Sequence, residues 1–248
     1  MRGPVEIAGG VYGLGSEGVN WYLVEDGGRL TAVDAGLPKF HETLEEDLRA
    51  IGRAPADVHA VVLTHSDSDH TGVVPALRDA GARVLIHSAD DETLRHPGPK
   101  KGEAAPARAL PRVAWRWRFW KVMGQMTLAG GAKPPKIEGA ETFADGEVLD
   151  VPGHPRVVHT PGHTDGHSVL LFEDRSTLFV GDALCTVNFF TGRPGAQLMP
   201  GPTNVSTSQA RESLAAIEPL DANLLLPGHG EPWHGSPTAA VVQARAVL

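Results

Sequence analysis

Side chains of the types that bind metal ions are concentrated in one short segment, residues 64–72, with the sequence THSDSDHTG. Two imidazoles, His65 and His70, and two carboxylates, Asp67 and Asp69, stand close together there. The apolar run AVVL precedes the segment, so the segment is predicted to follow a buried strand. Imidazole nitrogens and carboxylate oxygens are common ligands of divalent metals, and this density is unusual for a core or a simple turn. The segment therefore predicts part of a metal centre.

More residues of the same types stand where later predicted strands end. They are His163, Asp182 and His229. Loops at one edge of an α/β sheet face a common crevice, so we expect these residues to converge on the segment. A carboxylate beside a glycine, such as Asp34, can also be a simple turn residue. The chain has a single cysteine, Cys185, which excludes an intrachain disulfide and a thiolate-rich zinc site.

The hydrophobic pattern predicts an α/β protein in which strands alternate with helices. Predicted strands cover residues 5–12, 19–25, 29–34, 61–64, 83–86, 142–149, 156–159, 168–173, 177–180 and 224–226. Predicted helices cover residues 40–51, 73–81, 209–217 and 237–247. Residues 97–136 break this alternation, because they begin with PGPKKG and contain three of the five tryptophans. We interpret them as an insertion of one or two helices.

The composition narrows the class of protein. The 248 residues, 41% hydrophobic and 21% charged, suffice for a sizeable core. A net charge of −8 argues against nucleic-acid binding, which needs a basic face. No apolar run has membrane-spanning length, and the N-terminal residues do not read as a signal peptide. We expect a cytoplasmic protein with a small-molecule substrate, no nucleic-acid partner and no stable membrane insertion, and leave a homodimer open.

The motifs and their order resemble those of the metallo-β-lactamase fold superfamily. That family has an HxHxDH motif, a histidine in a PGHT context, an aspartate after a strand and a final histidine in a GH context. The present chain has HSDSDH at 65–70, TPGHT at 160–164, VGD at 180–182 and PGHG at 227–230. The resemblance implies one domain over residues 1–248, folded as a four-layered αβ/βα sandwich. It also implies that the insertion at about residues 97–136 is a helical lid.

The resemblance assigns roles to the residues that match its motifs. It implies two divalent metal ions, zinc in the first place, with iron or manganese as alternatives. Site one would consist of His65, residue 67 and His163, and site two of Asp69, His70 and His229. Asp182 would bridge the two sites, Asp34 would orient the ligand loop, and His167 would support the ligands from behind. Asp69 and Asp182 would also be catalytic, because two such ions convert a shared water into hydroxide.

Asp67 departs from the family pattern, which has histidine at that position. Three interpretations remain open. Asp67 could bind the metal and make the site richer in oxygen, which lowers its Lewis acidity. It could be too short to reach, so that site one is weak or empty. Or the protein could have lost catalysis.

Several other residues are candidates for the wall of a substrate pocket. Trp115, Trp117, Phe119 and Trp120 lie in the insertion and could form an apolar wall under a lid. They could equally belong to an amphipathic helix packed on the sheet. Arg193 could bind a substrate carboxylate or be a surface charge. Cys185 stands where lactonases of this fold have a tyrosine, and it could line the pocket or be an inert buried residue.

Three functions follow as hypotheses. The first is a hydrolase in which a metal-bound hydroxide cleaves an ester, lactone, thioester or related bond of a small molecule. The second is an iron-dependent oxidoreductase, such as a thiol or persulfide dioxygenase or a diiron site that handles oxygen. The third is a non-catalytic binding protein on the same fold. Metal content and oxygen uptake separate the three.

Overall fold

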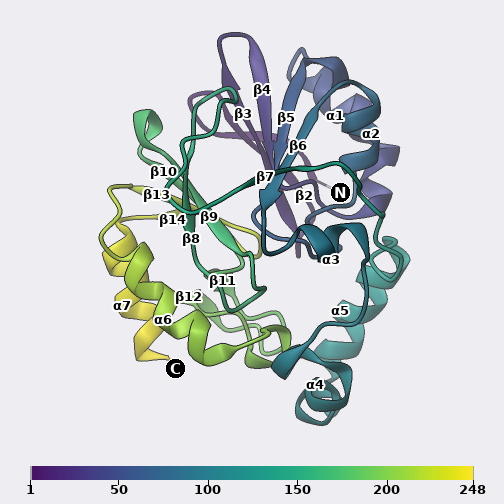
Figure 1. The fold of residues 1–248 in the computed structure, drawn as a ribbon. Coiled ribbons are helices and arrows are strands. Elements are labelled where there is room, and N and C mark those ends of the chain that lie inside the picture. The colour runs from purple at the N-terminus through teal and green to yellow at the C-terminus, as the bar shows by residue number, and fades with distance from the viewer. Residues whose placement is uncertain (1, 248) are drawn as a thin grey trace.

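The computed structural model describes residues 2–247, which form two β-sheets flanked by helices (Figure 1). The larger sheet has the strand order β1-β2-β3-β4-β5-β6-β7, and the second has the order β14-β13-β10-β9-β8. Strands of the first sheet are β1 (Arg2–Ala8), β2 (Val11–Gly15), β3 (Asn20–Asp26), β4 (Arg29–Val33), β5 (Val58–Val62), β6 (Arg83–His87) and β7 (Glu141–Phe143). Strands of the second are β8 (Arg156–His159), β9 (Ser168–Phe172), β10 (Thr177–Gly181), β13 (Leu224–Pro227) and β14 (Trp233–His234).

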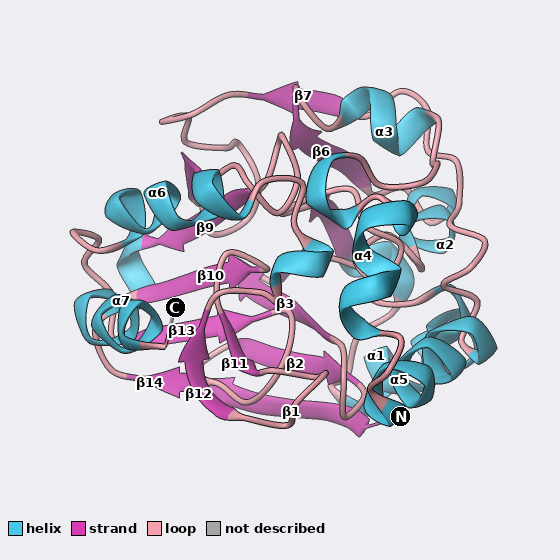
Figure 2. Ribbon diagram, turned by 90° about the horizontal axis from the view of Figure 1, so that it is seen from below, coloured by secondary structure: helices cyan, strands magenta, loops and turns pink. Residues whose placement is uncertain are grey.

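The described residues also form seven α-helices. They are α1 (Leu44–Ala50), α2 (Val74–Asp79), α3 (Asp91–Arg95), α4 (Pro106–Val113), α5 (Trp117–Leu128), α6 (Thr207–Ile217) and α7 (Pro237–Ala246). A separate hairpin pairs β11 (Cys185–Val187) with β12 (Pro194–Gln197). Seen from below, α6 and α7 lie on one side of the strands and α1 and α2 on the other (Figure 2). None of the helices within residues 2–247 has both the length and the apolar character that crossing a membrane requires.

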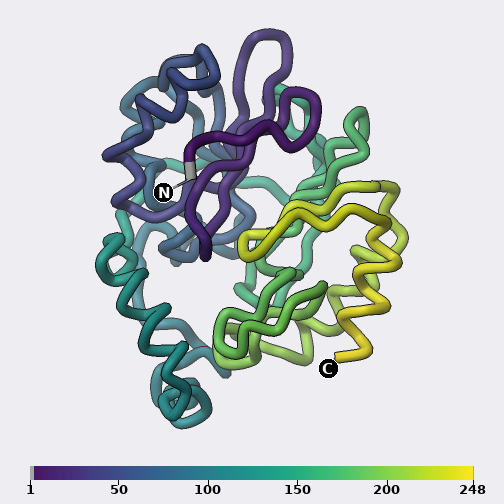
Figure 3. Tube along the Cα trace, turned by 180° about the vertical axis from the view of Figure 1, so that it is seen from behind, coloured from purple at the N-terminus to yellow at the C-terminus, as the bar shows by residue number. Residues whose placement is uncertain are grey.

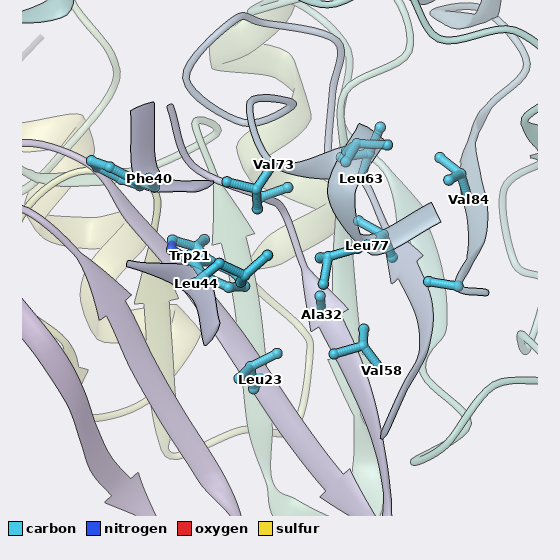
Figure 4. Close-up of a cluster of buried hydrophobic side chains, with 14 of the residues drawn as sticks. Trp21, Leu23, Ala32, Phe40, Leu44, Val58, Leu63, Val73, Leu77 and Val84 are labelled. Carbon is cyan, nitrogen blue, oxygen red and sulfur yellow. The ribbon is translucent and has the colours of Figure 1, made fainter. Parts of the chain in front are cut away.

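Three clusters of buried side chains define the layers. One cluster joins α1 and α2 to the outer face of the first sheet, with Trp21, Leu44 and Leu77 among its members (Figure 4). A second joins the inner faces of the two sheets, and a third joins the second sheet to α6 and α7. The resulting order of helices, sheet, sheet and helices confirms the predicted αβ/βα sandwich.

Alternation along the strands explains how both faces of each sheet become buried. In β3, Leu23 belongs to the cluster under α1, whereas its neighbours Tyr22 and Val24 belong to the cluster between the sheets. In β13, Leu225 faces α6 and α7, and the residues on either side of it face the first sheet. Successive side chains of a strand point to opposite faces, so apolar runs are required where both faces are covered.

The two halves of the chain lie side by side, with α4 and α5 along one end (Figure 3). Residues 97–136 contain two α-helices, α4 and α5, and a short 3₁₀ turn at Gly102–Ala104. Whether this segment acts as a lid stays a prediction.

Some predicted elements were wrong in their boundaries. The strand predicted over residues 5–12 is two strands, β1 and β2, because Gly10 turns the chain with φ of 71°. The helix predicted over residues 40–51 begins only at Leu44, after a separate 3₁₀ turn at Pro38–Glu42. The strand predicted over residues 142–149 is reduced to β7, since a turn with Gly146 at φ of 79° ends it. Strands β11, β12 and β14 were not predicted.

Candidate metal centre

Four strand ends deliver the predicted ligands to one place. Strand β5 leads into the loop of residues 64–72, and the β8–β9 connection carries His163. Asp182 follows β10, and His229 follows β13. The parallel pairs β4–β5 and β10–β13 point their carboxyl ends to the same edge of the sandwich, where their loops meet.

The structure brings all seven predicted ligand residues together. Their ligand atoms form three groups, and within each group these atoms lie within 4.8 Å of one another. The groups are His65, Asp67 and His163; His65, His70 and Asp182; and Asp69, His70 and His229. The first and third match the predicted sites one and two, and Asp182 lies between them. Its Oδ2 is 3.2 Å from His163 Nε2 and 3.3 Å from His229 Nε2. Binding of metal by these residues stays a prediction.

All four imidazoles are held in the same way. Each is hydrogen-bonded at Nδ1 to a protein oxygen, which leaves Nε2 directed toward the centre. The pairs are His65 with Thr64 Oγ1 (2.9 Å), His70 with Asp34 Oδ2 (2.8 Å), His163 with Asn204 Oδ1 (3.0 Å) and His229 with Gly18 O (2.5 Å). Carbonyl and carboxylate oxygens only accept, so Nδ1 carries the proton there and Nε2 of the neutral ring presents a lone pair.

Buried polar atoms at the centre fit a metal ion. Within residues 2–247, His65 Nε2, His70 Nε2 and Asp182 Oδ1 are buried without a hydrogen-bond partner. Such atoms are rare because an unsatisfied buried polar group costs about 1–3 kcal/mol. Gly228 keeps the space open, since a Cβ there would lie 2.5 Å from Asp182 Oδ1 and 2.6 Å from His70 Cε1. The donor set of imidazole and carboxylate suits zinc, iron and manganese.

Electrostatics also favour a cation at this point. Burial alone would lower the pKa of His70, but Asp34, Asp182 and Asp69 raise it to about 10. Burial would likewise lower the pKa of His229, but Asp182 and Asp69 raise it to about 9. In the absence of metal, protonated His70 and His229 therefore supply the positive charge beside these carboxylates. A divalent ion would displace these protons.

Asp34 and His167 support the ligands from behind. Asp34 accepts hydrogen bonds from His70 and from Thr64, whose amide lies 2.8 Å from Oδ1. His167 Nε2 accepts from the backbone N–H of Asp182 at 2.9 Å, and its Nδ1 lies 2.9 Å from Thr160 Oγ1. Because a backbone N–H can only donate, Nε2 is unprotonated. Burial first, then the neighbouring imidazoles, hold the pKa of His167 well below its ordinary value, so this ring is neutral.

Asp90, which joins the two ligand loops, was not predicted. Its carboxylate accepts from Ser66 N at 3.0 Å, Thr164 Oγ1 at 2.8 Å and Gly166 N at 2.7 Å. Ser66 adjoins His65 and Thr164 adjoins His163, so Asp90 fixes the spacing of two ligands. Asn204, the partner of His163, was missed as well, because neither Asp90 nor Asn204 belongs to a recognisable motif.

Lys100 was also missed, and it lies inside the predicted site one. Its ammonium forms an ion pair with Asp67 Oδ2, lies 3.1 Å from His163 Nε2 and donates to Thr203 O at 2.9 Å. Burial would raise the pKa of Asp67, but the Lys100 ammonium beside it holds it well below its usual range. Asp67 is therefore an anion paired with a lysine.

The predicted pocket residues lie in different surroundings. Trp115, Trp117 and Trp120 are 72%, 68% and 58% exposed, whereas Phe119 is buried and its ring packs 5.8 Å from that of Phe190. Cys185 is fully buried, with Sγ 3.7 Å from Leu198 O, so it does not line an open pocket. Burial raises the pKa of this thiol.

Arg193 is exposed, and its backbone N–H donates to Thr191 Oγ1 while its carbonyl accepts from Gln197 Nε2. Phe189, which was not predicted, packs its ring 5.3 Å from that of His229. A cavity of about 830 Å³ lies between α4 and the start of α6, and its walls include Arg112, Phe190 and Arg211. None of the seven ligand residues lines this cavity, so the metal centre is identified by its donor atoms rather than by this hollow.

Comparison with known proteins agrees with the geometry. The sequence model described as the Metallo-beta-lactamase superfamily matches residues 14–229. A protein of Bacillus subtilis named probable metallo-hydrolase YflN is 25% identical, over 93% of this chain and 87% of that protein. An atrochrysone carboxyl ACP thioesterase of Aspergillus fumigatus is 25% identical over 91% of this chain, but this chain covers only 55% of that protein.

Solved structures are similar as well. A crystal structure of a metallo-beta-lactamase family protein from Thermus thermophilus matches 96% of this chain and 79% of that chain, with a TM-score of 0.68 and 26% identity. The family match extends across every residue of the candidate metal centre, from Asp34 to His229. The chain therefore belongs to the metallo-beta-lactamase superfamily.

Proposed function

We propose that this chain is a metal-dependent hydrolase that cleaves an ester, thioester or lactone of a small molecule. The observation that carries the proposal is the convergence of four imidazole Nε2 atoms and the carboxylates of Asp69 and Asp182 on one buried point. Three atoms there, His65 Nε2, His70 Nε2 and Asp182 Oδ1, are buried without a hydrogen-bond partner among the described residues. Such atoms are rare in a stable core unless a ligand binds them. Membership of a superfamily that contains hydrolases supports the same conclusion.

The residues would divide the work as follows. Asp69, His70 and His229, with Asp182, would hold a divalent ion, for which zinc is the first choice. When bound, such an ion supplies Lewis acidity and lowers the pKa of water. Asp69 would orient the attacking water through a hydrogen bond and accept its proton. Asp34 and His167 would keep His70 and Asp182 in position, because each binds the side of its partner that faces away from the centre.

Thioesters come first among the substrates. One relative, the fungal protein named above, carries the name of a thioesterase, and a thioester carbonyl suits attack by an activated water. We propose a small acyl substrate and no nucleic-acid or membrane partner.

The test is a hydrolysis screen on the purified chain. Protein stripped with a chelator and then reloaded with zinc should hydrolyse at least one member of a panel of aryl esters, lactones and acyl thioesters. The stripped protein and an Asp69→Asn variant should lose at least about 100-fold in rate. Oxygen consumption by an iron-loaded chain, with no hydrolysis of the panel, would instead establish the oxidoreductase alternative.

A further inference from the structure

Lys100 occupies the position where a metal of site one would bind. Its Nζ contacts Asp67 Oδ2 and His163 Nε2, which are two of the three ligand atoms in that group. A zinc ion bound by the same two atoms would lie about 2.0–2.2 Å from each. The ion would then press against the ammonium, and two cations in contact inside a buried site repel strongly. Lys100 and a site-one metal therefore exclude each other.

The ammonium is fully satisfied in this place. An ammonium group has three N–H donors, and Lys100 has three partners: Asp67 Oδ2, His163 Nε2 and Thr203 O. The side chains of Lys100 and Asp67 are only 26% and 20% exposed, so solvent weakens their pairing little. The Lys100 ammonium is therefore stable in site one with no metal bound there.

A cation is needed between the acceptors of site one. His163 donates Nδ1–H to Asn204, so Nε2 of the neutral ring presents a lone pair. That atom lies 3.0 Å from Asp67 Oδ2 and 3.2 Å from Asp182 Oδ2. A lone pair this close to the Asp67 carboxylate is repulsive unless a positive charge lies beside both, and Lys100, which contacts Asp67 Oδ2 and His163 Nε2, provides it.

The backbone around Lys100 is tied to the same loop that positions His163. Gly102 has φ of 60°, and a Cβ there would lie 2.0 Å from Val205 O. The next residue donates its N–H to Val205 O at 3.0 Å, and Val205 in turn donates to His163 O at 3.1 Å. The backbone next to Lys100 is therefore fixed by its contacts with Val205, which is itself bonded to His163.

Site two differs, because no lysine or arginine of the described residues pairs with its carboxylates. Among residues 2–247, Asp69 and Asp182 form ion pairs only with histidines. Lys100 cancels the charge of Asp67, so Asp69 and Asp182 retain two negative charges, which match one divalent ion.

We propose that the Lys100 ammonium replaces the metal ion of site one, so that the chain binds a single divalent ion, at Asp69, His70, His229 and Asp182. This inference rests on the proposed metal-dependent function, but it is tested by stoichiometry rather than by turnover. It shares an empty site one with the second interpretation of Asp67 but gives a different cause: Asp67 reaches the site and pairs there with Lys100.

The experiment counts metal ions on the full chain. Stripped protein is titrated with Co²⁺, and binding is followed by the visible absorption bands of the bound ion. The zinc content of the reloaded protein is measured by elemental mass spectrometry. Wild type should saturate at close to one ion per chain, and Lys100→Met should saturate at close to two. Lys101→Met is the matched control, since the neighbouring side chain is exposed, and it should stay at one.

Two results would overturn the inference. One is a wild-type chain that binds two ions of similar affinity. The other is a folded Lys100→Met variant, checked by circular dichroism, that still binds one. Lys100→Gln serves if the methionine variant does not fold, and the same outcomes apply to it. A chain with one ion that hydrolyses nothing contradicts only the proposed function, whereas a hydrolase with two ions contradicts only the role of Lys100.

Discussion

Asp90 shows how a single buried carboxylate can hold two ligand loops in register. It is 2% exposed and accepts three hydrogen bonds, from one residue of the 64–72 loop and two residues of the 160–167 loop. Charged hydrogen bonds of this kind contribute about 1.5–3 kcal/mol each. Because His65 and His163 flank these contacts, their separation depends on a residue that touches neither.

Replacing Asp90 should therefore weaken both the fold and the metal centre. Asp90→Ala leaves three buried donors without an acceptor, and we expect a loss of about 3–6 kcal/mol in the free energy of unfolding. Metal affinity should fall about 10–100-fold, as is typical when a residue that orients ligands is removed. Denaturant unfolding and competition with a chromophoric chelator measure the two effects.

Asp91→Ala is the control, because Asp91 forms a partly exposed ion pair with Arg95 on its own helix. It should cost less than about 1 kcal/mol. Equal effects of the two substitutions would show that Asp90 has no special role.

Sequence reasoning reached the candidate ligands and two of their supports, Asp34 and His167, but not the other residues that position them. His65, Asp69 and the other predicted ligands stand in short motifs at strand ends, where spacing alone indicates chemistry. Lys100, Asp90 and Asn204 reach the centre from loops through contacts between distant parts of the chain. No periodicity or motif marks such residues, so only the folded structure could find them.

Glycines decide how closely the strand-end loops can approach one another. Gly228 follows β13 and leaves room for Asp182 and His70, whereas Gly124 lies on α5 with nothing within 4 Å of its missing Cβ. The two glycines therefore have opposite effects on the structure around them. One is required by close packing, and the other weakens a helix.

Substitution by alanine should separate these cases. Gly228→Ala places a methyl group 2.5 Å from Asp182 Oδ1, so we expect metal binding to drop at least about 10-fold. Gly124→Ala should raise the free energy of unfolding by about 0.5–1 kcal/mol and leave metal binding unchanged. Thermal unfolding and chelator competition provide the readouts. If Gly228→Ala bound metal like wild type, the assignment of this space to the ion would be wrong.

At the level of elements, continuous apolar runs predicted the buried strands well, whereas turn residues did not predict element boundaries. Strands such as β9 and β13 were found because both of their faces are buried and their sequences are continuously apolar. The short strands β11, β12 and β14 are defined by their pairing partners, because two to four residues carry too little pattern to predict a strand. The αβ/βα order came from the family resemblance, because the packing of two sheets is a property of the whole chain.

The whole molecule couples its stability to the charge at the centre. The raised pKa values of His70 and His229, about 10 and about 9, exceed the unfolded value of about 6.5. The folded state therefore binds protons more tightly than the unfolded state. Stability from these protons is fully present below about pH 6.5 and is lost as pH rises through the folded values.

Metal-free protein should accordingly become less stable between about pH 6.5 and 8.5, by more than about 1 kcal/mol. The unfolded thiol of Cys185 titrates only near pH 8.5, so it adds little in this window. Urea unfolding of the stripped chain at several pH values measures the effect. Zinc-loaded protein is the control, because metal replaces the protons and its binding strengthens as they leave. A flat or rising profile of the stripped chain would contradict the charged centre.

The central claim is that two halves of the chain build one metal centre with a lysine beside it. Anomalous diffraction at the zinc edge, from a crystal of the zinc-reloaded chain, tests it most directly. The account predicts one strong peak enclosed by Asp69, His70, His229 and Asp182, with Lys100 still paired to Asp67. No peak at these residues would contradict the metal centre itself, and a second peak of equal height between Asp67 and His163 would contradict the role of Lys100.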